Sequence, residues 1–206
     1  MIRSTQKRHL LALLTVVLAL FALLLMHPTA GAVDADEDEL IGANIQDGVL
    51  LGYYGPGGDI VIPNTVTKIG DEAFKGNKKV TSVIIPGSVV DIGNNAFEAC
   101  ENLKKVAFTN PGEARNNLLI RLSAFKDCTK LTEVEIPARV KQIVGNIFKG
   151  CTSLTNVKVN ANNPYYFTED GVLFGPALVE DAPQYDDNYV LLTYPAGRQG
   201  AYSIPS

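Results

Sequence analysis

The side chains that could perform chemistry in this chain are few, and their positions exclude the commonest enzyme mechanisms. The only two histidines, His9 and His27, both lie within the first 32 residues. Without that segment no imidazole remains to activate a serine or cysteine nucleophile or to bind a metal ion. Paired-carboxylate chemistry stays open, because the chain has 22 acidic residues. We expect no enzymatic activity, no cofactor and no metal ion.

The cysteines are the next candidates, and all three occupy one place in a repeated pattern: Cys100, Cys128 and Cys151. If the protein is exported to an oxidising compartment, a disulfide could form between cysteines of neighbouring units. An odd number of cysteines, with Asn77 at the equivalent place one unit earlier, favours packing over cross-linking. The sequence therefore predicts a ladder of buried free thiols, with a disulfide as the alternative.

Acidic residues gather in two places. Residues 34–39 carry five carboxylates in six positions, and a second group contains Glu180, Asp181, Asp186 and Asp187. Such runs usually remain solvated. Four carboxylates could hold Ca²⁺, but their spacing matches no known calcium loop. We interpret both groups as solvated, with a cation site as the alternative.

The elements that position these residues come from a repeat. Four phenylalanines are separated by 23, 28 and 23 residues, which indicates a 23-residue unit with one five-residue insertion: Phe74, Phe97, Phe125 and Phe148. A fixed period in this range is typical of stacked arrays. One unit alone buries too little apolar surface to offset the entropy of ordering its backbone, so its stability depends on its neighbours.

The pattern in each 23-residue unit predicts a short strand followed by a turn. Apolar residues alternate with polar ones at period two, as at Val134 and Ile136, which suits a strand with one face inward. Proline directly after Ile62, Ile85 and Ile136 closes the strand, since it cannot donate a ladder hydrogen bond. The Gly-x-x-Ala-Phe stretch is too short for a helix, and we expect a single helical turn there.

The complete pattern is Leu-x-x-Val-x-Ile-Pro, then Val-x-x-Ile-Gly, then Ala-Phe-x-x-Cys, and it is nearly complete in residues 80–100 and 131–151. It resembles the BspA-like (Treponema pallidum-type) leucine-rich repeats of bacterial cell-surface proteins, from about Asp47 to the end of the chain. The third unit departs from the pattern, with Phe108-Thr109 in place of Ile-Pro. The resemblance implies a leucine-rich repeat solenoid, of the α/β horseshoe class but rich in β-structure, with parallel strands stacked at a 23-residue period.

The ends of the chain predict its domain organisation. Basic residues, an apolar run and a small-residue site at Ala30-Gly31-Ala32 predict a signal peptide over residues 1–32, with an uncleaved membrane anchor as the alternative. Residues 33–46 are predicted to be an acidic flexible leader, and residues 47–206 the repeat domain. A β-hairpin is expected to interrupt the array at about residues 164–197. The pattern at Ile204-Pro205 indicates an array that is cut off at residue 206.

Charge limits the partners. Residues 1–32 contain 3 of the 18 basic residues and none of the 22 acidic ones, so the remainder has a formal charge of 15 minus 22, or −7. Nucleic acid is excluded as a partner, because phosphate binding requires a basic surface. Membrane contact is expected only through the signal segment, if it is not cleaved.

The outward positions of the strands predict a ligand face. If Val134 and Ile136 point inward, the alternate positions form rows on the exposed face of the sheet, and we select as contact residues Lys105, Glu133, Glu135, Asn156 and Lys158. Residues 109–117 contain the insertion, which either contacts a ligand or has no role. An extended face suits a protein or glycan better than a small substrate, which needs a concave pocket.

Two functions remain. The resemblance implies a secreted or cell-surface module without catalysis that mediates adhesion to extracellular proteins, including host matrix proteins, or to glycans. The alternative is an accessory domain of a larger exported enzyme whose catalytic part lies beyond residue 206. More repeats and a wall-sorting segment in the downstream reading frame would favour the first function, whereas a hydrolase domain there would favour the second.

Overall fold

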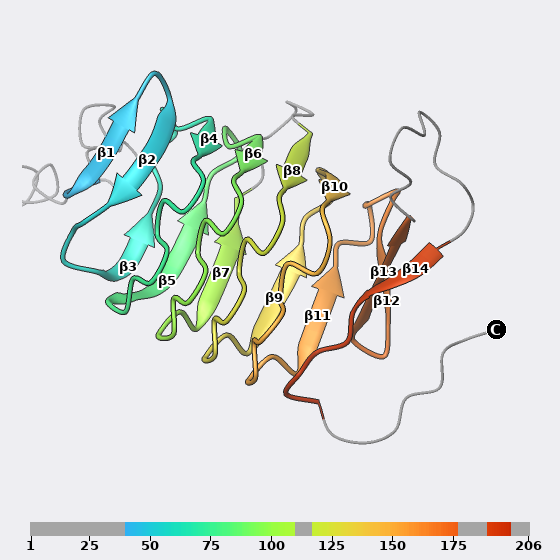
Figure 1. The fold of residues 1–206 in the computed structure, drawn as a ribbon. Helices are drawn as coiled ribbons and strands as arrows, with labels where there is room; N and C mark the ends of the chain where they lie inside the picture. The colour runs from blue at the N-terminus through green and yellow to red at the C-terminus, as the bar shows by residue number, and fades with distance from the viewer. Residues whose placement is uncertain (1–39, 110–116, 177–188, 199–206) are drawn as a thin grey trace, which may run out of the picture. The chain divides into compact units, whose positions relative to one another are not determined.

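The chain folds into a stack of coils (Figure 1). A computed structural model describes residues 40–109, 117–176 and 189–198, all within one compact unit, Asp38–Ser206. These described residues form strands and turns, and none of them forms a helix. The described part therefore has no helix of the length and hydropathy needed to cross a membrane.

Three sheets make up the described structure. Sheet A contains, in spatial order, β1 (Ala43–Gln46), β2 (Val49–Tyr53), β4 (Lys68–Ile69), β6 (Asp91–Ile92), β8 (Leu118–Ile120) and β10 (Val140–Ile143). Sheet B contains β11 (Asn156–Val159), β9 (Glu133–Ile136), β7 (Lys105–Phe108), β5 (Val80–Ile85) and β3 (Gly58–Val61). Sheet C contains β12 (Phe167–Glu169), β13 (Val172–Pro176) and β14 (Tyr189–Thr193).

One strand of sheet B and the following strand of sheet A form one coil. Coil 1 contains β3 and β4, coil 2 β5 and β6, coil 3 β7 and β8, and coil 4 β9 and β10, while β11 begins coil 5 (Figure 1). All neighbouring strands of sheet B are parallel, and Val134 lies between Val106 and Val157 in the register. Chain-adjacent coils are therefore neighbours in space, which confirms the predicted solenoid and its 23-residue step.

The core is a set of side-chain columns that run through the coils. The four phenylalanines of the repeat stack with ring centroids 4.6, 5.2 and 5.7 Å apart, and Tyr53 continues the column at 5.1 Å from Phe74. Phe97 is fully buried between two such rings. Offset aromatic stacking adds about 0.5–1.5 kcal/mol per pair to the burial of apolar area, so this column is a principal source of stability.

The predicted helical turn is wrong, because the backbone N–H groups of the first three repeat phenylalanines make hydrogen bonds between coils. Phe74 N donates to Ala96 O of the next coil at 2.7 Å, and Phe97 N donates to Ala124 O at 2.7 Å. Glu72 and Ala99 take positive φ angles of 60° and 56°, which a right-handed helix does not permit. Successive tight turns replace the helix, and stacking satisfies their donors.

The predicted thiol ladder is confirmed. Cys100, Cys128 and Cys151 are free and fully buried. Each Sγ lies 3.1 Å from the carbonyl oxygen of a phenylalanine in the preceding coil, to which its S–H donates. Burial raises the pKa of Cys100 to about 12, so this thiol stays protonated and can serve as the donor. In the first unit Asn77 Oδ1 accepts instead from two backbone N–H groups at 2.8 and 3.1 Å.

Two hairpins use the same turn at opposite ends of the array. Asp47-Gly48 joins β1 to β2 and Asp170-Gly171 joins β12 to β13, with positive φ at all four residues, as type I′ turns require.

Strand β1 lies within the predicted leader, so residues 43–46 belong to the fold. The expected hairpin region, residues 164–197, contains three antiparallel strands. Residues 177–188 of this region lie outside the described residues, as do the signal segment and both acidic groups.

Candidate functional site

The outer face of sheet B carries the predicted contact residues. Lys105 lies opposite Glu133, which lies opposite Asn156, and Glu135 lies opposite Lys158. In β9 the two glutamates are exposed and the two apolar residues buried, as the period-two alternation predicts. The rows inferred from the sequence therefore exist as rows in the structure.

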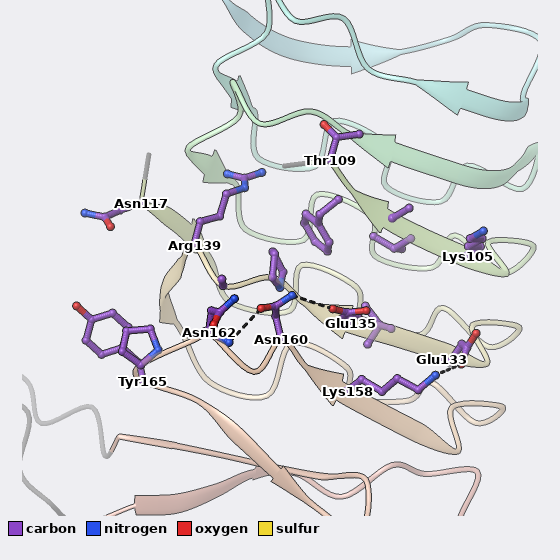
Figure 2. Close-up of a pocket in the computed structure, with 17 residues that line it drawn as sticks. Lys105, Thr109, Asn117, Glu133, Glu135, Arg139, Lys158, Asn160, Asn162 and Tyr165 are labelled. Carbon is purple, nitrogen blue, oxygen red and sulfur yellow. Dashed lines mark hydrogen bonds and ion pairs between the residues drawn. The ribbon is translucent and has the colours of Figure 1, made fainter. Parts of the chain in front are cut away.

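An open groove of about 860 Å³ crosses this face over β7, β9 and β11. Figure 2 shows its lining, which includes four of the five predicted residues: Lys105, Glu133, Glu135 and Lys158. The fifth, Asn156, is half-buried and does not line the groove. The structure thus brings most of the predicted set together at one concave site.

Two polar contacts cross the groove between β9 and the end of β11. Lys158 Nζ forms an ion pair with Glu133 Oε2 at 3.1 Å, and Asn160 Nδ2 donates to Glu135 Oε1 at 3.3 Å. The side chains of the ion pair are 55% and 63% exposed. Because exposed pairs contribute about 0–1 kcal/mol, these groups can exchange their partners for those of a ligand at small cost.

Sequence reasoning missed Arg139, which lines the groove from the turn between β9 and β10. Its Nη1 donates to Val89 O, and its Nη2 donates to Pro86 O at 3.1 Å. Both carbonyls belong to coil 2, so this side chain of coil 4 passes coil 3 altogether.

The long reach of Arg139 spans the coil that carries the insertion. In the regular stack Ser88 of coil 2 donates to Val66 O of coil 1, its immediate neighbour, at 2.8 Å. Coil 3 has the insertion at the equivalent turn, and Arg139, two places after Pro137 as Ser88 is two places after Pro86, donates to carbonyls one coil further away. The arginine side chain is long enough to span this distance.

The insertion also marks the position of the groove. Thr109 and Asn117, on either side of residues 110–116, both line it (Figure 2). In the sequence, the replacement of Ile-Pro by Phe108-Thr109 had indicated that the turn after the strand of coil 3 differs from those of the other coils. That signal pointed to the region, but not to Arg139 or Tyr165, which reach the groove from coils 4 and 5.

The other end of the outer face has a different character. Val61 of β3 is 61% exposed, and it lies opposite Ile84, which is also exposed. The carboxylate next to this pair, Asp59, accepts hydrogen bonds from Ser82 Oγ and Thr81 Oγ1 at 2.6 and 2.9 Å. These bonds lower the pKa of Asp59 by stabilising its charged form.

The described residues offer no metal centre. Within 40–109, 117–176 and 189–198, no three acidic, cysteine or histidine side chains lie close enough to share an ion. The geometry is that of an open groove on the outer face of a repeat solenoid.

Comparison with known proteins agrees with this class. The sequence profile of the BspA type leucine rich repeat region matches residues 56–169 in six copies. That is more than half of the chain, and the chain belongs to this family. The resemblance drawn from the sequence is therefore confirmed. No curated protein matches the chain at a significant level.

The chain is similar to several solved structures, of which the pneumococcal vaccine antigen PcpA shows the same fold. PcpA is 27% identical with a TM-score of 0.55, over 72% of this chain and 38% of its own. A leucine-rich repeat protein from Bacteroides capillosus is 30% identical with a TM-score of 0.45, over 55% and 86%. The T. pallidum leucine rich repeat protein is 25% identical with a TM-score of 0.41, over 53% and 62%. The chain thus spans about two fifths of the pneumococcal antigen.

Proposed function

We propose that this chain is an exported, non-catalytic recognition module that binds an extracellular protein through the outer face of sheet B. The observation that carries the proposal is the clustering of Lys105, Glu133, Glu135 and Lys158 around one groove. Leucine-rich repeat proteins generally mediate protein binding, and the neighbour PcpA is described as a vaccine antigen, which is consistent with exposure at a cell surface.

The groove has the chemistry of a protein interface. Its lining combines aromatic and proline side chains, including Phe108, Pro137 and Tyr165, with charges of both signs. Tyrosine, phenylalanine and arginine are enriched where proteins meet. Four of the charged lining residues have exposed side chains, so a partner can reach them without unfolding the array: Lys105, Glu133, Glu135 and Lys158.

Binding of the purified chain to immobilised fibronectin, fibrinogen and cell-wall glycan tests this function. We expect saturable binding to a protein, and a change of about five-fold or more in affinity in a variant with Glu133→Lys and Glu135→Lys, with a sign that depends on the charge of the partner. The matched control is Glu72→Lys with Glu169→Lys, which makes the same charge change at exposed positions outside the groove. Circular dichroism and thermal melting must show that both variants are folded.

Two results would contradict the proposal. Equal affinities of the two double variants would show that the groove is not the site. Failure of the folded wild type to bind any of the protein ligands would count against matrix adhesion by this chain. The accessory domain of an exported enzyme stays the alternative prediction, and the adjoining reading frame would reveal it.

A further inference from the structure

Arg139 carries a partly buried positive charge without a carboxylate partner in the described structure. No ion pair includes it, and burial alone lowers its pKa, with no contribution from a nearby acid. Arginine nevertheless remains charged in proteins. A desolvated charge is costly when it is not paired. An anionic group next to the guanidinium would therefore stabilise it.

The hydrogen bonds of Arg139 leave part of the guanidinium unused. Two of its five N–H groups donate to the carbonyls of Pro86 and Val89, which are neutral acceptors. Its Nε is buried and has no acceptor. Figure 2 shows the side chain pointing away from the contact between Glu135 and Asn160.

Neutral groups can satisfy the same kind of carbonyl pair. In the next turn of this type, Asn163 Nδ2 donates to Pro137 O and Val140 O at 2.9 and 3.1 Å. Capping of the turn therefore needs donors but no charge. The reach across coil 3 explains a long side chain at position 139, and the positive charge remains to be explained.

The acidic groups of the groove are already engaged elsewhere. Glu133 pairs with Lys158, and Glu135 accepts from Asn160. Lys105 adds a further positive charge, so the five charged residues that line the groove have a formal balance of +1, on a chain whose formal charge is −4. The groove is thus a locally basic site on an acidic protein, and it favours a partner of negative charge.

We propose that the groove binds an acidic segment of a partner polypeptide, one of whose carboxylates pairs with the guanidinium of Arg139. This inference rests on the proposed function and specifies the ligand. Arginine and carboxylate form strong, charge-assisted hydrogen bonds. The nearby Phe108 and Tyr165 supply the aromatic contacts usual in protein interfaces, which favours a polypeptide over an acidic sugar.

Fluorescence anisotropy of a labelled ten-residue oligoglutamate peptide tests the inference on the full chain at low salt. We expect oligoglutamate to bind at least ten-fold more tightly than oligoglutamine, and sodium chloride to weaken it. Arg139→Gln should weaken binding by five-fold or more. Lys141→Gln, which removes an exposed charge on β10 outside the groove, should change it less than two-fold.

A second pair of variants keeps the test decisive if Arg139→Gln does not fold. Lys105→Gln should weaken oligoglutamate binding two- to three-fold, and Glu135→Gln should strengthen it by a similar factor, because each changes only an exposed side chain. Thermal melting separates lost binding from lost structure.

Equal affinity for the two peptides, or equal effects of Arg139→Gln and Lys141→Gln, would overturn the inference and leave Arg139 a purely structural residue. Tighter binding of polygalacturonate than of oligoglutamate would overturn it in favour of an acidic glycan. If oligoglutamate fails to bind but the Glu133→Lys, Glu135→Lys variant still binds a matrix protein with altered affinity, the proposed function stands and only the acidic ligand is wrong.

Discussion

The inner and outer faces of sheet B belong to the same strands but follow different rules. Inward positions hold the same kind of residue in every coil, as Val83, Val106, Val134 and Val157 show. Outward positions change from the apolar pair Val61 and Ile84 at one end to the charged groove at the other. The interior is constrained by the stacking of each coil on its neighbours, whereas the exterior is free to vary.

This difference separates stability from recognition. A solenoid sums the interfaces between coils, so a substitution inside one coil damages two interfaces. A substitution on the outer face damages none, and its effect is expected in binding. Changes of graded severity, from core to surface, can test whether the two faces are as independent as their sequences indicate.

The largest expected effect is the loss of a core ring. Phe97→Ala removes a fully buried side chain stacked between Phe74 and Phe125, and we expect the free energy of unfolding to fall by about 3–5 kcal/mol. Urea denaturation followed by circular dichroism measures the change. Phe167→Ala, at a ring that is 41% exposed, is the control and should cost clearly less. Equal costs would mean that the column is not a continuous core.

Loss of the bridge across the insertion should come next. Arg139→Ala removes two hydrogen bonds to carbonyls of coil 2, although Pro86 O keeps the N–H of Val89 as a donor. We expect a loss of about 1.5–3 kcal/mol. Ser88→Ala removes one hydrogen bond between adjacent coils, at Val66 O, and should cost about 1 kcal/mol. Chemical denaturation of both variants makes the comparison. If Arg139→Ala costs no more than Ser88→Ala, the bridge contributes little and the residue is free to serve the groove alone.

The sequence was sufficient for the features that depend on local alternation. Val134 and Ile136 point inward and Glu133 and Glu135 outward because strand geometry alternates side chains between faces. The 23-residue step then predicted that Lys158 would lie beside Glu135. These inferences need only the 23-residue repeat and one assumption about which strand side chains point inward. The fold and most of the groove's charged residues could therefore be predicted.

Features that depend on contacts between distant residues were not accessible in this way. Arg139 meets its acceptors 50 and 53 positions earlier in the chain, and no short-range pattern contains that information. A single helical turn was expected because the Gly-x-x-Ala-Phe stretch is too short for a helix, whereas Phe97 N donates to the next coil. The omission of Arg139 and the wrong helical turn have the same cause. Both depend on contacts between stacked coils, which a pattern within one coil does not contain.

A charge cluster on sheet A should make stability depend on pH. Asp91, whose side chain is 16% exposed, accepts from Arg121 at 2.8 Å and pairs with Lys68 at 3.3 Å. Burial acts to raise the pKa of Asp91, but these two cations outweigh it and the pKa is lowered. The stabilisation is therefore present above the unfolded value of about 3.9 and is lost as pH falls through the lower folded pKa.

Acid titration of urea unfolding measures this effect. We expect Asp91→Asn to cost about 1 kcal/mol at neutral pH, and its stability to fall less steeply than that of the wild type below about pH 4. A control at an exposed carboxylate, Glu169→Gln, should leave the pH profile unchanged. Parallel profiles for Asp91→Asn and the wild type would show that the cluster does not carry the dependence.

The smallest effect on stability is expected at the groove itself. Glu133→Gln removes the ion pair with Lys158, but both side chains are more than half exposed, so solvent screens their attraction and the loss should be below about 0.5 kcal/mol. Urea denaturation of the single and double variants gives the coupling energy between the two residues. A coupling above about 1 kcal/mol would mean that the outer face helps to hold β9 against β11. The groove charges would then be partly structural, and their effects on ligand binding could not be interpreted without a correction for folding. A small coupling would leave Glu133 and Lys158 free to vary for recognition, as the contrast between the two faces of sheet B requires.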